Sequence, residues 1–256
     1  MLSVGPALLA ELSRIIYLGP VRRLAQRDYL WSGRFPGSIG DDGGQAVDAL
    51  IASGVAKEEA RRRRLPTPSA ARLFDETAHW LRSMGLADDL QVRQLGRSAR
   101  YELLVVSGKG ASNLKDVGVG VSQVLPVVVA ALFAAPGHIV IVEEPESHLH
   151  PLAQTQLAEM FVAVSRERQV QFIVETHSEQ LLRRMQTLVA NERTAPGQLS
   201  MYFVERIGSE AVLKTLEVDE FGTIRPWPEH FFGDSAGEAR EQARARAERM
   251  RKASNA

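Results

Sequence analysis

The stretch "HIVIVEEPESHLHP", residues 138–151, decides the fold. Four apolar β-branched residues, 139–142, run directly into three glutamates, Glu143, Glu144 and Glu146. A short apolar run of this kind is typical of a strand that is buried on both faces, as in parallel sheets. Carboxylates gathered at the end of such a strand repel one another unless a positive group, usually a metal ion, lies among them. The stretch therefore predicts a buried strand that ends at a cation-binding acidic cluster.

The chain on either side of this cluster alternates between helices and strands. We expect strands over 139–143 and 171–175 and helices over 123–135, 152–166 and 178–190. Thr176 and Glu179 have the spacing of a capping box for the last of these helices. Pro126 is expected in the first turn of its helix, where proline is tolerated. Apolar strands that alternate with helices predict an α/β fold with a partial parallel sheet covered by helices on both faces.

The segments before and after this core have different patterns. Before it, we expect helices over 6–16, 44–53 (capped by Asp41 or Asp42) and 69–86, and a β-hairpin over 90–106 that turns at residues 96–99. After it, "LSMYFVER" and "EAVLKTLEV" read as strands near the sheet edge, "FGTIRPWPEHFF" as an aromatic turn segment, and residues 236–253 as a solvated helix. We divide the chain by its motifs into residues 1–106, 107–205 and 206–256.

Composition excludes several classes of function. The 256 residues include 31 basic and 31 acidic side chains, so no whole-protein charge attracts nucleic acid, although a local patch could. Residues 61–64, four arginines, most simply form a solvated face, with nucleic-acid contact as the alternative. The chain has no cysteine, which excludes disulfides, thiolate metal sites and a cysteine nucleophile. Without a membrane-length apolar run or a convincing signal peptide, we expect a cytoplasmic protein with no membrane partner.

The predicted strand ends bring chemically active residues together. Ligands of open parallel sheets bind outside the carboxyl ends of the strands. Glu143 ends one strand, and His177 lies just past the end of the strand over 171–175. If the two strands are neighbours, Glu143, Glu144 and His177 share one crevice. The loop over 116–122 leads into a helix N-terminus, which favours anions. Together these features predict a nucleoside triphosphate site.

Three motifs in this order resemble the ATPase heads of the ABC type, in their SMC-like and OLD-like bacterial branch. "IVIVEEPESHLHP" resembles the Walker B and D-loop region, "VGVGVSQVLP" (117–126) the divergent signature motif, and "FIVETHSEQLL" the switch-histidine loop. "YLGPVR" near the start resembles a further piece of this group, and "FGTIRPWPEHFF" resembles part of its C-terminal domain of unknown function. The resemblance covers most of the chain, but only residues 116–180 carry chemistry.

This resemblance implies ATP and Mg²⁺ as cofactors and gives roles to individual residues. Glu143, in the place of the usual aspartate, would hold Mg²⁺ through water, Glu144 would orient or deprotonate the attacking water, and His177 would sense the γ-phosphate. The signature residues would contact a nucleotide held by a facing head: Gly118, Gly120, Ser122 and Gln123. Residues 146–150 would line the seam of a dimer of heads.

The resemblance also leaves a gap. A Walker A loop, G-x-x-x-x-G-K-[ST], wraps the phosphates with backbone N–H groups and a lysine. The sequence contains no such loop, because Gly108 and Lys109 lack both the upstream glycine and the Ser/Thr. We therefore expect the C-terminal half of a head, whose partner is a Walker A-bearing lobe or a homologous head. DNA contact through an effector or a basic patch, and a role in DNA repair or phage defence, are analogies from the family.

Other interpretations of the same residues stay open. The chain could be a regulatory or scaffolding fragment that binds no nucleotide and pairs with a complete head. It could also be an unrelated metal-dependent hydrolase, because H-x-H is a metal-ligand spacing. The ligands would then come from the acidic cluster: Glu143, Glu144, Glu146, His148 and His150. In simpler structural terms, His148 and His150 are turn residues, His177 begins a helix, and Gly118 and Gly120 are turn glycines.

Overall fold

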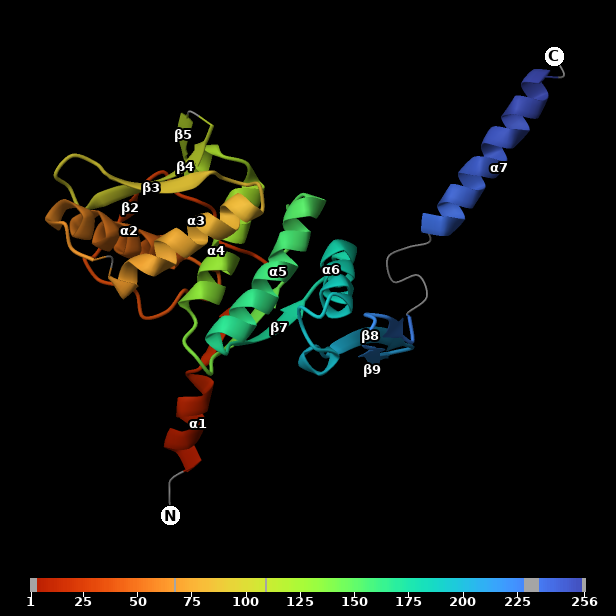
Figure 1. Cartoon of the computed structure of the whole chain (residues 1–256), viewed down its shortest axis with the longest axis horizontal. Helices are drawn as coiled ribbons and strands as arrows, with labels where there is room; N and C mark the ends of the chain where they lie inside the picture. Colours follow the sequence, from red (N-terminus) through yellow and green to blue (C-terminus); the bar gives the residue numbers. More distant parts are fainter. Residues whose placement is uncertain (1–3, 67, 109, 228–234, 255–256) are drawn as a thin grey trace. The chain divides into compact units, whose positions relative to one another are not determined.

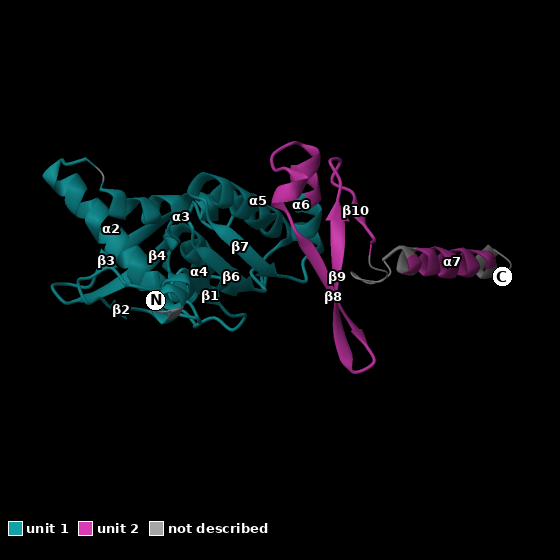
Figure 2. Cartoon of the chain, turned by 90° about the horizontal axis from the view of Figure 1, so that it is seen from below, with its two compact units in different colours: residues 1–185 teal, residues 186–256 magenta. Residues whose placement is uncertain are grey.

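The computed structural model describes all residues except 1–3, 67, 109, 228–234 and 255–256. The chain forms two compact units, residues 1–185 and 186–256, coloured teal and magenta in Figure 2. The division by motifs into 1–106, 107–205 and 206–256 stays a prediction. Gly108 lies at a turn, whereas Lys109 lies outside the described residues.

A three-stranded parallel sheet forms the centre of the first unit. Its strands, in the order β1-β6-β7, are β1 (Ile15–Leu18), β6 (Ile139–Glu143) and β7 (Gln171–Glu175). The pairing aligns Leu18 with Val142, and Glu143 with Glu175. The predicted α/β fold and the adjacency of the strands over 139–143 and 171–175 are confirmed.

Helices cover one face of this sheet. α4 (Val119–Phe133) and α5 (Pro151–Arg168) contact this face, and α3 (Arg72–Ser83) packs against these two helices (Figure 1). Leu18, Val140 and Val142 lie on the covered face and are at most 1% exposed. The ring of Phe161 on α5 packs against that of Phe172 on β7, with centroids 4.9 Å apart. The residues that pack against the helices occupy every second position of each strand. The positions between them point to the opposite face of the sheet.

The opposite face of the sheet is open in the part of the chain that the structure describes. The strand register places on it a set of alternate residues: Ile15, Tyr17, Ile139, Ile141 and Ile173. Ile15 is 37%, Tyr17 42% and Ile173 49% exposed. We call these five residues the open face. The expectation that helices cover both faces is therefore met on one face only.

The start of the chain differs from the sequence prediction. The helix predicted over 6–16 ends earlier, as α1 (Val4–Leu12), because "IIYL" pairs with β6 as β1. The segment is a strand because its main chain hydrogen-bonds to the neighbouring strand β6. The local pattern that favours a helix over 6–16 contains no sign of this pairing. The helix predicted over 44–53 extends further, as α2 (Ala46–Arg63). Asp42 accepts a hydrogen bond from the Gly44 N–H at 2.8 Å, so it orders the loop before α2 and does not cap the helix itself.

A second sheet in this unit contains the predicted hairpin. Its strands are β2 (Tyr29–Leu30), β3 (Asp89–Gln94), β4 (Arg100–Ser107) and β5 (Gly110–Asn113). β4 pairs antiparallel with the other three. The hairpin predicted over 90–106 is thus confirmed, as is the helix predicted over 69–86, which is α3 preceded by a 3₁₀ turn, Ser69–Ala71.

α4 begins four residues before the predicted start. It begins at Val119, after the 3₁₀ turn Leu114–Asp116, so Pro126 lies in the helix interior and removes one helical hydrogen bond. The first turn of α4 is instead formed by the glycine-bearing signature motif, with Gly118 as N-cap. Arg168 of α5 donates to the carbonyl oxygen of Leu132 at 2.7 Å and pairs with Glu76 of α3, which links the three helices.

The second unit comprises residues 186–256. α6 (Glu179–Ala190) contains the boundary between the units, and the 3₁₀ turn Pro196–Gln198 follows it. β8 (Met201–Ile207), β9 (Glu210–Val218) and β10 (Ile224–Arg225) form an antiparallel sheet of their own. The strands expected near the sheet edge therefore form, but in a separate sheet. α7 (Ser235–Ser254) confirms the predicted C-terminal helix, whereas residues 228–232 of the aromatic segment lie outside the described residues. No helix in the described ranges is long and apolar enough to cross a membrane.

Leu157→Ala should destabilise the chain by about 2–5 kcal/mol, because it removes a buried side chain and leaves a cavity. Leu157 is 0% exposed on α5. Leu152→Ala on the same helix is the control, since Leu152 is 60% exposed and its loss should cost less than about 0.5 kcal/mol. Urea unfolding at equilibrium measures both. Equal effects of the two variants would contradict the packing described for α5.

Candidate functional site

Two segments meet at the carboxyl ends of β6 and β7. We call residues 143–150 the acidic turn and residues 175–178 the β7 segment. The N–H of Glu144 donates to the carbonyl oxygen of Glu175 at 2.9 Å, which continues the sheet pairing by one residue. The structure thus brings the predicted residues Glu143, Glu144 and His177 to neighbouring strand ends.

Glu143 ends β6 and receives a hydrogen bond from β1. The Tyr17 hydroxyl donates to Glu143 Oε1 at 2.8 Å. This hydrogen bond is the largest cause that raises the pKa of Tyr17 above its usual value, so the phenol remains a donor at neutral pH. No chemical role was predicted for Tyr17, which begins the "YLGPVR" segment directly after the helix expected over 6–16.

Glu144 has an unusual backbone conformation. Its φ of 41° lies in the left-handed region, which is costly for a residue other than glycine. The Ser147 hydroxyl donates to Glu144 Oε2 at 2.9 Å. The main chain and the carboxylate of Glu144 are therefore both held by specific partners, as is common for strained residues at functional sites.

A buried arginine lies beneath the acidic turn. Arg22 is 4% exposed, and its Nη2 donates to the carbonyl oxygens of Glu143 at 2.6 Å and Glu144 at 3.1 Å. Burial lowers the pKa of Arg22, and the charges of Glu146 and Glu144 oppose this shift. The signal for this residue in the sequence is its place in the "YLGPVR" segment.

Glu146 ties the acidic turn to the β7 segment. It is 8% exposed, and its Oε1 accepts hydrogen bonds from Thr176 Oγ1 at 2.6 Å and from the His177 N–H at 2.7 Å. Hydrogen bonds from an N–H and a hydroxyl to a carboxylate are stronger than neutral ones. This carboxylate therefore fixes the main chain at His177 relative to β6.

The cap of α6 differs from the predicted capping box of Thr176 and Glu179. Ser178 Oγ accepts from the Leu181 N–H at 2.9 Å and donates to Gln154 Oε1 at 2.6 Å. Ser178 is thus the N-cap, and the capping-box prediction is wrong. Thr176 Oγ1 instead accepts from the Ser178 N–H at 3.0 Å, which lies before the helix, and donates to Glu146 Oε1 at 2.6 Å.

The side chain of His177 is available to a ligand. It is 77% exposed, and its Nε2 lies 3.4 Å from Glu175 Oε1. Glu175 is a candidate that the sequence reasoning missed, although it ends the strand next to Glu143. Its carboxylate could orient the imidazole or supply a second oxygen to a cation.

The signature residues begin α4 and contact the acidic turn. A Cβ added at Gly120 would lie 2.7 Å from the carbonyl oxygen of His148, so only glycine fits this approach. Ser122 Oγ donates to the carbonyl oxygen of Val119 at 2.9 Å. Gly118 is exposed and Ser122 is half-buried, whereas Gln123 is 7% exposed. Their contact with a nucleotide stays a prediction.

One histidine of the acidic turn caps a helix, and the other lies within the turn. His150 is the N-cap of α5, and its Nδ1 accepts from the Leu152 N–H at 3.4 Å. His148 has a φ of 64°. Among the described residues, no group of three or more His, Asp or Glu side chains is arranged to hold a metal ion. Mg²⁺ needs only one or two carboxylates beside water and phosphate, so Glu143, with Glu175 on the neighbouring strand end, suits it chemically.

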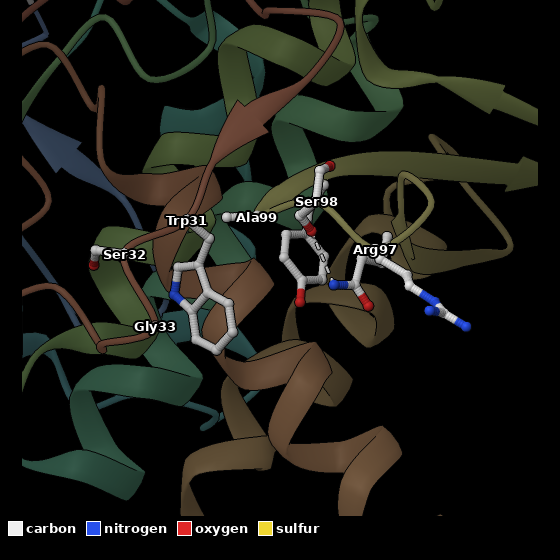
Figure 3. A pocket seen from close by; sticks show the side chains of 8 residues that line it. Trp31, Ser32, Gly33, Arg97, Ser98 and Ala99 are labelled. Atoms are coloured by element: carbon white, nitrogen blue, oxygen red, sulfur yellow. Dashed lines mark hydrogen bonds between the residues drawn. The ribbon is translucent and has the colours of Figure 1, made fainter.

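A shallow pocket lies elsewhere in the first unit (Figure 3). It has a volume of about 390 Å³ and lies between β2 and the β3–β4 turn. Trp31 and Tyr101 meet there edge to face, with ring centroids 5.5 Å apart. Arg97 also lines this pocket, but no carboxylate or histidine does, and none of the predicted site residues belongs to it.

The helix-backed parallel sheet and its acidic turn are those of an AAA-type ATPase domain. The family model described as an AAA domain, putative AbiEii toxin, Type IV TA system, matches residues 22–183. This is more than half of the chain, and the chain belongs to that family. A second model, of a protein of unknown function (DUF3696), matches residues 195–242 and confirms the predicted resemblance of the C-terminal segment.

Several solved structures of SMC ATPase heads are similar at low identity. A structure from a study of ATP-driven dimerization and DNA-stimulated activation of SMC ATPases is 13% identical, with a TM-score of 0.42 over 57% of this chain and 83% of that one. An Smc head with coiled coil and joint from Pyrococcus yayanosii is 13% identical, with a TM-score of 0.44 over 58% and 27% of the two chains. An SmcHead bound to the C-winged helix domain of ScpA is 12% identical, with a TM-score of 0.45 over 68% and 50%. The chain thus spans half or less of the last two.

Gly120→Ala should lower stability by about 1–3 kcal/mol, because the new methyl group meets a main-chain oxygen that cannot move alone. Gly118→Ala is the control, since a Cβ there meets nothing within 4 Å. Thermal unfolding of both variants tests this expectation. If Gly120→Ala unfolds at the wild-type temperature, the close contact between the signature loop and the acidic turn is not present in solution.

Proposed function

We propose that this chain provides the acidic-turn lobe of an ATP-hydrolysing head of the ABC and SMC type. The observation that carries the proposal is the arrangement of Glu143 and Glu144 at the end of β6. Both are held by specific hydrogen bonds, and the β7 segment with His177 lies at the neighbouring strand end. Family membership supports the ATPase class, and the roles of the residues are our proposal.

Each side chain has one role in the proposed reaction. Glu143 would hold Mg²⁺, which when bound would offset the negative charge of the phosphates. Glu144 orients a water molecule and accepts its proton as the water oxygen bonds to the γ-phosphorus and the bond to the bridging oxygen breaks. His177 donates a hydrogen bond to the γ-phosphate. The position of the β7 segment then depends on whether the γ-phosphate is present.

The reaction also needs a phosphate-binding loop, which the 256 residues do not contain. We propose that a Walker A-bearing lobe, on the same or another polypeptide, packs against the open face and against the edge of β7 that pairs with no strand in the described part of the chain. Parallel sheets are almost always covered on both faces. The exposed side chains of Ile15, Tyr17 and Ile173 support this surface as the contact. Glu143 lies on the same face of the sheet as Ile141, so a lobe bound there reaches the acidic turn.

Two heads would complete each other's sites in this proposal. Gly118, Gly120, Ser122 and Gln123 would meet a nucleotide held by a facing head, and the exposure of Gly118 supports access to that loop. Residues 146–150 would lie at the same seam. DNA contact, a role in DNA repair or phage defence, and a cytoplasmic location remain predictions.

A second function is favoured by the missing Walker A loop. A fragment that binds no nucleotide could pair with a complete head and regulate it. The two proposals differ in one measurable quantity, which is whether Glu144 contributes to ATP turnover in the complete assembly.

Glu144→Gln should lower kcat by about 100-fold or more in the assembly that contains the Walker A lobe, because glutamine cannot accept the proton. Glu143→Gln should instead weaken Mg²⁺-dependent nucleotide binding, and Ser122→Arg should block pairing of heads without affecting nucleotide held in cis. The chain is purified with the proteins that bind it, and ATPase rate, nucleotide affinity and oligomer mass are measured for each variant. Turnover at the wild-type rate by Glu144→Gln would show the catalytic assignment to be wrong.

The isolated chain should bind ATP weakly, because most phosphate contacts come from the missing loop. Adding the partner lobe should restore binding, and Ile173→Glu should prevent this by placing a charge on the open face. Val204→Glu is the control, since Val204 is 63% exposed on β8 in the other unit. Calorimetry measures ATP affinity with and without the partner. Micromolar ATP binding by the pure chain would contradict the proposed need for a second lobe.

A further inference from the structure

Arg22 has an environment that surface arginines do not have. It is 4% exposed and lies just after β1, yet its polar contacts are with residues more than 120 positions away in the sequence. Both of these contacts are main-chain carbonyl oxygens, of Glu143 and of Glu144. Among the described residues, its Nε and Nη1 have no hydrogen-bond partner. A buried cation is costly, so its place beneath this turn requires a reason.

The reason lies in the backbone at Glu144. Its left-handed φ of 41° turns the chain sharply at the end of β6. In this conformation two successive carbonyl oxygens accept hydrogen bonds from one nitrogen of Arg22. Without that donor, the carbonyl oxygens of Glu143 and Glu144 would both lose the hydrogen bond from Arg22, and that of Glu144 would keep the one from the Ser147 N–H at 3.2 Å. A more extended backbone at Glu144 would then be favoured.

We propose that Arg22 is a positioning residue that fixes the left-handed turn and thereby orients the carboxylates of Glu143 and Glu144. This proposal rests on the function proposed above and adds a residue to the same site. Arg22 acts through the main chain and does not touch the substrate. Its positive charge also lies near the carboxylates of Glu144 and Glu146.

The guanidinium group suits this role better than an ammonium group. Its planar donors have fixed directions, so the two carbonyl oxygens are held in one geometry. A lysine at the same position would keep the charge but would offer a flexible donor. A displacement of about 1 Å in a catalytic group can cost about 100-fold in rate. The two substitutions therefore separate the role of charge from the role of geometry.

The experiment compares Arg22→Met, Arg22→Lys and Arg23→Met in the full chain. Arg23 is the matched control, because its guanidinium is 58% exposed and pairs with Asp42. Hydrogen exchange is followed in the isolated chain over residues 143–150, where the N–H groups of Glu144, Ser147 and Leu149 are hydrogen-bonded. In the assembled head, kcat and KM for ATP are measured for the same variants.

We expect Arg22→Met to lose at least about tenfold of the exchange protection in the acidic turn while the rest of β6 keeps its protection. In the assembled head, kcat should fall at least about tenfold with KM within about twofold of wild type. Arg22→Lys should recover part of both losses, and Arg23→Met should match the wild type. If Arg22→Met fails to fold, Arg22→Lys alone should still show reduced protection and a lower kcat.

Two results would overturn the proposal. One is unchanged protection of the acidic turn, or unchanged kcat, in Arg22→Met, or in Arg22→Lys where the methionine variant fails to fold. The other is a loss of protection spread evenly over β1, β6 and β7, which would assign Arg22 to general packing. If the wild-type assembly hydrolyses no ATP, the proposed function fails, and the exchange measurement still decides whether Arg22 fixes the turn.

Discussion

The parallel pairing of β6 with β1 and β7 is the constraint on which the candidate site depends. The chain leaves the sheet at the carboxyl end of each strand, and the parallel pairing brings the three carboxyl ends side by side. Tyr17 reaches Glu143 because β1 lies beside β6, and Glu144 bonds to Glu175 because β7 lies on the other side. A slip of one residue in this register would move Glu143 to the face covered by helices.

Two buried charged residues connect the polar groups of the site. Glu146 and Arg22 are both buried, and each spends its hydrogen bonds on main-chain or hydroxyl groups of a neighbouring segment. A buried charge of this kind contributes geometry more than stability, because its desolvation offsets much of the attraction. The site thus has a rigid frame of buried charges, with Glu143, Glu144 and His177 more accessible at its edge.

The open face links the fold to the proposed assembly. One side of the sheet packs against α4 and α5, while the other exposes Ile15, Tyr17 and Ile173. A sheet that is apolar on both faces and covered on one is suited to a partner that completes its second layer. Glu143 belongs to the exposed side of the register, so in the proposed assembly a lobe bound at this surface would lie beside the strand end.

The sequence by itself determined the order of the motifs, the α/β class, β6 and β7 with their bounds, and the acidic cluster. These features depend on local patterns: an apolar run, a helical period, or a motif of fixed spacing. Only the tertiary structure decided that "IIYL" is a strand, that Thr176 bonds to Glu146, and that Arg22 lies beneath the acidic turn. The Tyr17–Glu143 hydrogen bond joins residues 126 positions apart, and no local pattern encodes a contact of that range. The sequence also does not show that one face of the sheet is open. A fully apolar strand predicts a buried strand, but it does not indicate whether helices cover one face or both.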